Sequence, residues 1–248
     1  MTTWIFLRGL TRESRHWGDF GGMFQQTFPD ATVVTLDLAG NGLLNHQTSP
    51  RCVKVLMADC RRQLAQRLIK PPYHVLAMSL GAMVSVAWAQ AYPHEMAAQV
   101  LINTSMRPYN PFYQRLRAGS YGSLIRLAWC GTSALQCEHT ILKITSNRRD
   151  ESVLPTWLAL RRANPVSTHN ALNQLIAAAR FCAQTGPLAV PTLLLASELD
   201  QLVSVNCSRT LARAWQCALQ LHTSAGHDLP LDDGPWVLEQ IAQWLSRS

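Results

Sequence analysis

Residues 73–81 of the chain read YHVLAMSLG, an apolar run that ends on a serine between small residues. The run Tyr73–Met78 is typical of a short buried strand, and the small-residue segment Gly81–Tyr92 is typical of a helix. Ser79 therefore stands on a sharp turn from strand to helix. A serine on such a turn is held in a strained conformation, with its hydroxyl pointing away from the sheet.

Small residues flank this serine on both sides. Ala77 lies two positions before it and Gly81 two positions after it, which suits a turn where strand and helix cross closely. Glycine is more usual than Ala77 at the first position, but alanine is small enough for the crossing. The turn also places Ser79 at a helix N-terminus, where N–H groups and the helix dipole favour negative charge.

Alternating strand-like and helix-like stretches extend outward from this turn. Uninterrupted apolar strands separated by amphipathic helices predict an α/β fold, a mostly parallel sheet with helices on both faces. The strand-like stretches are Trp4–Leu7, Thr32–Leu38, Tyr73–Met78, Ala98–Asn103, Pro191–Ala196 and Leu219–Thr223. The helix-like stretches are residues 53–68, Gly81–Tyr92, Val203–Trp215 and a final one that opens at Asp232-Asp233-Gly234-Pro235.

The alternation stops between residues 107 and 187. This stretch is helical in pattern over Trp157–Ala163 and Asn170–Cys182, and it is too long for a simple crossover. We therefore expect residues 107–187 to form an inserted helical cap, and residues 1–106 and 188–248 to form one core domain.

The positive charge of the chain is concentrated in the predicted cap. Residues 107–187 hold ten Lys or Arg and three Asp or Glu, which accounts for the whole formal net charge of +7. A solvated helical face would explain this pattern, and so would attraction of an anionic substrate or partner. Nucleic acid is disfavoured, because no basic motif interleaved with aromatic residues is present.

The composition of the chain excludes several classes of protein. The chain has 248 residues, of which 48% are hydrophobic and 15% charged, so it can fill a core and is not intrinsically disordered. Its apolar runs are much shorter than the roughly 18 residues that span a bilayer. The first residues resemble a strand and lack the features of a secretory signal, so we expect a cytosolic protein. Seven scattered cysteines without a C-x-x-C pair argue against a zinc site or a disulfide framework.

A serine hydroxyl becomes a nucleophile only when a base takes its proton, and the base needs a carboxylate to orient it. In a parallel sheet both groups come from loops at the carboxyl ends of later strands. Asp200 follows the strand Pro191–Ala196, and His227 follows the last strand within Gly226-His227-Asp228. The order Ser79, Asp200, His227 is that of a nucleophile, an acid and a base. Glu198 is the alternative acid, less favoured because it lies nearer the strand end. The ordinary alternatives are a helix cap for Ser79, a turn former for Asp200 and a surface loop residue for His227.

A tetrahedral intermediate needs two N–H donors. The backbone N–H of Leu80, directly after the serine, is one candidate. The second candidate is Leu10 N–H, in the loop after the first strand, where Gly9 permits the turn.

These motifs together resemble the α/β-hydrolase family over nearly the whole chain. The resemblance includes the segment 37–42, DLAGNG, the turn at Ser79, the acid after a strand and the final Gly-His. It implies a cofactor-free enzyme, and many members are carboxylesterases, thioesterases or lipases with a helical lid. Dehalogenases and epoxide hydrolases of this fold carry aspartate at the turn, so Ser79 disfavours them. The family usually has His-Gly after the first strand, where this chain has Arg8-Gly9; Arg8 could replace the loop-holding histidine or reach an anionic substrate group.

The sequence thus predicts a serine hydrolase that cleaves a carboxylic ester or thioester through an acyl-enzyme on Ser79. An apolar acyl pocket would be lined by cap residues, which could equally pack the cap onto the core; these are Trp129, Trp157, Leu158 and Leu160. Alternatives are an enzyme for acyl groups carried on coenzyme A or an acidic carrier protein, a lactonase or C–C bond hydrolase, and a hydrolase-like binding protein without catalysis. No metal is expected.

Overall fold

A six-stranded sheet of order β2-β1-β3-β4-β5-β6 organises the chain in the computed structural model, which describes residues 2–128 and 133–247. Every neighbouring pair of strands within these residues is parallel, which confirms the predicted α/β class. The strands are β1 (Thr2–Leu7), β2 (Ala31–Leu36), β3 (Tyr73–Met78), β4 (Met96–Ile102), β5 (Thr192–Ser197) and β6 (Ala218–His222).

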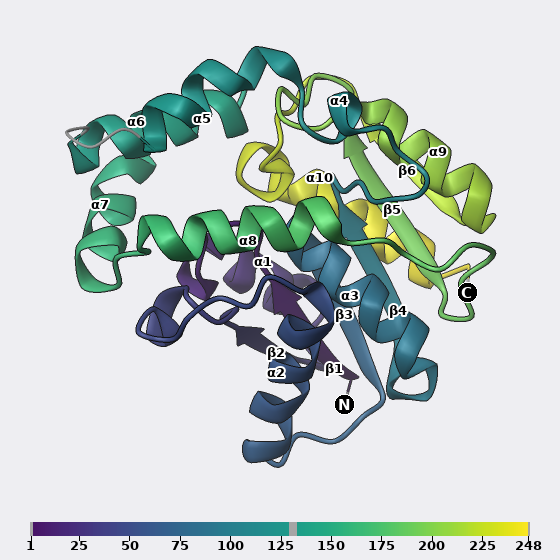
Figure 1. The fold of residues 1–248 in the computed structure, drawn as a ribbon. Coiled ribbons are helices and arrows are strands. Elements are labelled where there is room, and N and C mark those ends of the chain that lie inside the picture. Colours follow the sequence, from purple (N-terminus) through teal and green to yellow (C-terminus); the bar gives the residue numbers. More distant parts are fainter. Residues whose placement is uncertain (1, 129–132, 248) are drawn as a thin grey trace.

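Helices cover both faces of this sheet (Figure 1). On one face, α2 (Val53–Gln66), α3 (Leu80–Ala91) and α9 (Val205–Trp215) pack against the strand side chains, and on the other face α1 (Phe20–Thr27) and α10 (Leu229–Leu245) do so. Side chains alternate along each strand, so neighbouring residues of β1 enter different cores. Burial on both sides explains why the strands are apolar throughout.

A helical segment lies between β4 and β5 in the chain. Its helices are α4 (Phe112–Arg115), α5 (Tyr121–Ala128), α6 (Ala134–Thr145), α7 (Leu154–Ala163) and α8 (Thr168–Arg180), with short 3-10 turns at Ala118–Ser120 and Glu151–Val153. Further 3-10 turns occur at Ser14–Trp17, Gly42–Leu44 and Pro93–Glu95. In Figure 1, α5, α6 and α7 form an arc at one end of the sheet.

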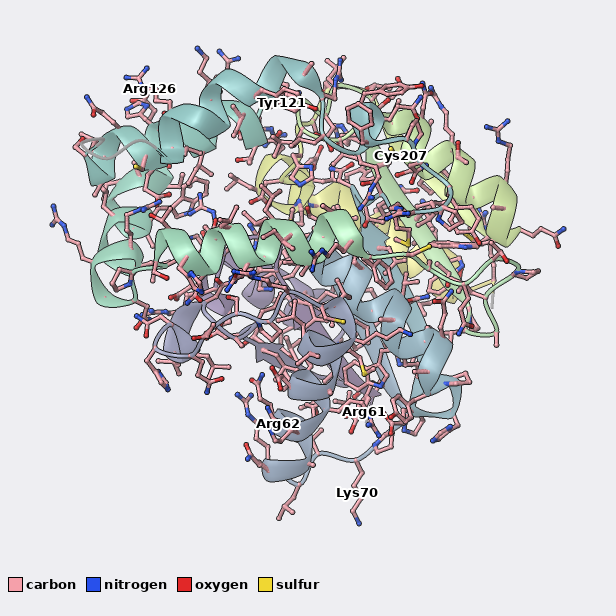
Figure 2. The ribbon with its side chains drawn as sticks, viewed as in Figure 1. Arg61, Arg62, Lys70, Tyr121, Arg126 and Cys207 are labelled. Atoms are coloured by element: carbon pink, nitrogen blue, oxygen red, sulfur yellow. The ribbon has the colours of Figure 1, made fainter. Side chains whose placement is uncertain are left out.

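The helical segment lies at the carboxyl ends of the strands. Figure 2 shows Lys70, which shortly precedes β3, at one end of the molecule, and Tyr121 and Arg126 of α5 at the opposite end. Since loops at the carboxyl ends of parallel strands bear the binding residues in such sheets, the helical segment is next to the predicted site.

The start of α10 differs from the prediction. The helical stretch begins at Leu229 rather than at Asp232, but Asp233 interrupts it with φ −151° and ψ 71°. The Asp233 carboxylate accepts a hydrogen bond from Trp236 N–H at 3.2 Å. Asp233 therefore caps the long helix near the predicted place, and a separate turn precedes it. Within the described residues, no helix is long and apolar enough to cross a membrane.

Candidate active site

Ser79 occupies the turn between β3 and α3 with φ 52° and ψ −117°. This left-handed backbone is costly for a residue with a side chain and is typical of functional sites. Hydrogen bonds on both sides hold it, since Ser79 N–H donates to the Ile102 carbonyl at 3.0 Å and Thr104 Oγ1 donates to the Ser79 carbonyl at 3.1 Å. The end of β4 therefore fixes the strained turn.

The space around the Ser79 turn explains why the residue at position 81 is small. A Cβ atom on Gly81 would lie 2.6 Å from the Arg8 carbonyl oxygen and 2.7 Å from that of Leu7, so only glycine fits against this backbone. A Cβ on Gly9 would lie 3.1 Å from Ser79 Cβ. The loop after β1 is thus in contact with the serine.

Leu10 and Leu80 lie next to these close approaches. Leu80 is the first residue of α3, directly after Ser79. The Leu10 N–H makes no hydrogen bond with any residue in 2–128 or 133–247. A backbone donor without a protein partner, in a loop that contacts the serine, suits the predicted second oxyanion donor.

Asp200 follows β5 and is 1% exposed. Its Oδ1 accepts backbone N–H groups from Leu202 at 2.7 Å and Val203 at 3.0 Å. These bonds fix the carboxylate so that Oδ2 lies 2.7 Å from Nδ1 of His227. The alternative acid, Glu198, instead pairs with Arg209 at 2.8 Å on the protein surface.

His227 is buried in the loop between β6 and α10. Burial by itself would lower its pKa, but the charge of Asp200 and the hydrogen bond to it outweigh burial, and the net pKa is raised. The structure thus brings Asp200 and His227 together as predicted from their positions in the chain. In the part of the chain that the structure describes, the Ser79 hydroxyl has no hydrogen bond; such bonds are often long before a substrate is bound.

Arg8 pairs with Asp228, the residue after His227. Its Nη1 and Nη2 lie 3.1 and 2.5 Å from the two carboxylate oxygens, and its guanidinium carbon is 4.9 Å from the ring centroid of Trp17. With both terminal nitrogens engaged and 3% of its surface exposed, Arg8 holds the loop after β1 against the histidine loop. This contact matches the loop-holding alternative for Arg8 rather than a substrate contact.

Trp157 and Leu160 are buried inside the helical segment, with 4% and 7% of their surfaces exposed. Trp157 packs in one cluster with Leu142 and Leu154. Its ring also lies under the guanidinium of Arg12, at 4.1 Å. Packing is therefore the observed role of Trp157, while Trp129 lies outside the described residues.

Buried charges join the helical segment to the loop after β1. Glu138 of α6, which is 1% exposed, accepts from Arg12 Nη1 at 2.8 Å and from Arg161 Nε at 2.5 Å. Burial lowers the pKa of Arg12, and the neighbouring Glu138 opposes that shift. The sequence did not single out this cluster, because its members come from distant segments.

Asn103, at the end of β4, is a further polar residue that the sequence did not single out. The sequence predicts Asn103 as the last residue of the strand Ala98–Asn103, whereas β4 ends at Ile102. Asn103 is 2% exposed, and its side chain donates to the His227 carbonyl. A polar residue that closes an apolar central strand was the available signal. Among the described residues, no group of three or more His, Cys, Asp or Glu could hold a metal ion.

The sheet is parallel and covered by helices on both faces. A strained serine follows β3, and a His–Asp pair follows later strands. These features together define an α/β-hydrolase. Residues 4–234 match a family model described as "Serine aminopeptidase, S33". The chain belongs to this family.

Comparison with individual proteins agrees on the fold. A thermophilic esterase from Thermogutta terrifontis superposes with TM-score 0.76 and 18% identity, over 100% of this chain and 90% of that one. The enol-lactonase from Burkholderia xenovorans LB400 gives 0.76 and 17%, over 99% and 91%. The uncharacterized protein YbdG of Bacillus subtilis (strain 168) is 22% identical over 104 residues, which are 42% of this chain and 32% of that protein. The match thus spans about a third of the length of this curated relative.

Proposed function

We propose that the protein is a serine hydrolase that cleaves a carboxylic ester or thioester through an acyl-enzyme on Ser79. The observation that carries the proposal is the 2.7 Å contact of His227 Nδ1 with Asp200, taken together with the backbone of Ser79, which the turn after β3 holds at φ 52°. The pair makes His227 a stronger base, and the turn after β3 supplies the alcohol that this base would deprotonate.

The reaction follows from the roles of these groups. His227 Nε2 takes the proton of the Ser79 hydroxyl while Oγ bonds to the acyl carbon, and the carbonyl oxygen becomes an oxyanion near Leu10 and Leu80 N–H. Collapse of this intermediate breaks the bond to the alcohol or thiol, which takes the proton from His227. Water then gives a proton to His227 and attacks the acyl carbon. The bond from that carbon to Ser79 Oγ breaks, the acid is released, and His227 returns the proton to Oγ. Asp200 orients the imidazole throughout.

We further propose that residues 107–187 act as a cap over this site. Support comes from the position of α5–α7 at the carboxyl end of the sheet (Figure 1) and from the Glu138 contact with the loop after β1. The acyl group would enter between the cap and the Ser79 turn.

Turnover of p-nitrophenyl esters and thioesters of varied acyl length tests the main proposal. Ser79→Ala should lose roughly a thousandfold or more in kcat/KM while staying folded. The matched control is Ser85→Ala, which removes the hydroxyl of a buried serine inside α3 that donates to Gln99 at 2.7 Å. Equal turnover by folded Ser79→Ala and the unaltered protein would refute the proposal. No labelling of Ser79 by a fluorophosphonate would favour a non-catalytic binding protein, and turnover confined to lactones or C–C substrates would redirect the reaction type.

A second candidate is an enzyme for acyl groups carried on coenzyme A or an acidic carrier protein. The observation that favours it is the ten-to-three excess of basic over acidic residues in 107–187. Several of these basic residues are exposed, among them Lys143, Arg149, Arg162 and Arg180, and Arg126 lies at the outer edge of α5 (Figure 2). Carrier-linked turnover should then fall steeply with ionic strength while small neutral esters do not respond. A flat response for both would remove this candidate.

A further inference from the structure

We propose that Asn103 is a positioning residue that holds the His227 loop in place relative to Ser79. This inference rests on the proposed function, since it assigns to Asn103 the alignment of nucleophile and base. It concerns a side chain that would act through others and would not touch the substrate itself.

Asn103 lies where its side chain can reach the loops that bear the site. It directly follows β4, the strand between β3, which precedes Ser79, and β5, which precedes Asp200. It is 2% exposed, and its φ of 45° is in the left-handed region. Asparagine tolerates this backbone better than other residues with side chains, apart from aspartate.

The amide of Asn103 is fully engaged. Its Nδ2 donates to the His227 carbonyl at 2.8 Å and lies 3.2 Å from the Gly226 carbonyl and 3.2 Å from Ser197 Oγ. Its Oδ1 accepts from Ser197 N–H at 2.8 Å. One side chain thus joins the end of β5 to the backbone of the predicted base.

The residues on either side of Asn103 hold the nucleophile. The Ile102 carbonyl accepts Ser79 N–H at 3.0 Å, and Thr104 Oγ1 donates to the Ser79 carbonyl at 3.1 Å. Three consecutive residues therefore fix both the Ser79 turn and the His227 backbone. The distance between the Ser79 turn and the His227 backbone therefore depends on residues 102–104.

Only a side chain that both donates and accepts can make these contacts. An aspartate carboxylate has the same shape and could still accept Ser197 N–H, but it has no proton to donate to the His227 and Gly226 carbonyls. It would place negative charge against carbonyl oxygens inside the protein. Without the amide, the His227 loop would lose its contact with the sheet at this point.

A loss of alignment should show in the chemical step. The nitrogen of the base must come within about 2.6–3.2 Å of the oxygen whose proton it abstracts. A misplacement of about 1 Å can cost about a hundredfold in rate. Substrate binding involves other surfaces and should be preserved. The expected signature is therefore a lower kcat with little change in KM.

Three variants test the proposal. Asn103→Gly removes the side chain and keeps a residue that accepts the left-handed backbone, whereas Asn103→Asp keeps the shape and removes the donor. Ser197→Ala is the matched control, because it removes a buried hydroxyl that lies against the Asn103 amide and that, within residues 2–128 and 133–247, makes no hydrogen bond with His227. Each variant is assayed well below its melting temperature for ester kcat and KM and for the rate of fluorophosphonate labelling of Ser79.

We expect both Asn103 variants to lose about a hundredfold in kcat and in labelling rate, with KM within about threefold of the unaltered protein. Ser197→Ala should lower the melting temperature and keep kcat within about threefold. Unchanged kcat in either folded Asn103 variant, with Ser79→Ala inactive, would overturn this inference and leave the proposed function standing. An equal loss of kcat in Ser197→Ala would also overturn it, since any damage to this network would then lower the rate and the Asn103 donor to the His227 carbonyl would have no particular role. Absence of Ser79-dependent turnover in the unaltered protein would overturn the proposed function itself.

Discussion

Arg8 and Asp228 form a buried ion pair between two loops that are distant in sequence and adjacent in the site. Nη1 and Nη2 of Arg8 lie 3.1 and 2.5 Å from the Asp228 carboxylate, and the two side chains are 3% and 5% exposed. Arg8 precedes Gly9, which lies so close to Ser79 that an added Cβ would be 3.1 Å from the serine Cβ, and Asp228 follows His227. The pair therefore connects the predicted oxyanion loop directly to the predicted base.

Removal of the cation from this pair should destabilise the fold. Arg8→Met leaves the Asp228 carboxylate buried without its partner, and we expect a loss of about 3–5 kcal/mol in the free energy of unfolding. Urea denaturation measures the change. Arg8→Met combined with Asp228→Asn also removes the buried negative charge, so it should recover part of the loss. A loss below about 1 kcal/mol in the single variant would show that the pair is not important for stability.

The Asp200 carboxylate should be essential for rate and not for folding geometry. Asp200→Asn would favour the wrong tautomer of His227, and we expect kcat to fall by about four orders of magnitude. Glu198→Gln is the control, since Glu198 pairs with Arg209 at the surface and should keep its rate. Steady-state ester kinetics on both variants measure the difference. The assignment of the acid would be wrong if Glu198→Gln lost activity and Asp200→Asn did not.

The raised pKa of His227 predicts the pH dependence of activity. His227 acts as a base only when it is neutral, so kcat/KM should fall as pH drops through its pKa in the free enzyme. Because Asp200 and the hydrogen bond to it outweigh the effect of burial, the midpoint should lie above the ordinary value of about 6.5. Asp200→Asn removes that charge and should move the midpoint of its residual activity to lower pH. A midpoint below 6 in the unaltered protein would contradict the raised pKa.

The same shift has a consequence for stability. A group with a higher pKa in the folded than in the unfolded state stabilises the fold fully below the unfolded pKa, and this contribution is lost as pH rises through the folded pKa. The contribution of His227 should therefore decrease across the range above about 6.5. Comparison of His227→Gln with the unaltered protein in urea, at a pH on each side of this range, measures it.

Glu138 should stabilise the attachment of the helical segment. Glu138→Gln keeps the shape but leaves Arg12 and Arg161 without the carboxylate between them, and Arg12 is itself buried. We expect a loss of about 3–5 kcal/mol in the free energy of unfolding. Urea unfolding followed by tryptophan fluorescence would report it, because Arg12 stacks on Trp157. Unaltered stability of Glu138→Gln would mean that the attachment is independent of this cluster.

Substitution of Trp157 tests whether this side chain packs the helical segment or lines an acyl pocket. Since it is 4% exposed and packs with Leu142 and Leu154, Trp157→Ala should cost about 3–5 kcal/mol in stability. KM for esters of different acyl length should change by the same small factor for all of them. A rise in KM confined to long acyl chains, without a stability loss, would instead show that Trp157 lines the pocket.

Local sequence pattern was sufficient to predict the fold and to propose the three catalytic positions. Apolar strands such as Tyr73–Met78 and the small residue Gly81 after Ser79 encode geometry between chain neighbours, which is set by strand pleat and by steric limits at a turn. The order of strands in a parallel sheet then placed Asp200 and His227 at one edge. These inferences need only short-range physics and the rule that binding loops follow strands.

Tertiary structure alone decided how the loops are held. The contacts of Arg8 with Asp228 and of Glu138 with Arg12 join residues 220 and 126 positions apart, and no local pattern specifies which buried charge meets which. Asn103 has a left-handed backbone and is held by contacts with Ser197 and His227, which come from distant parts of the chain, so its own segment does not reveal them. Packing of the whole chain fixes these partners, because a buried polar group must find a partner wherever the fold brings one within reach.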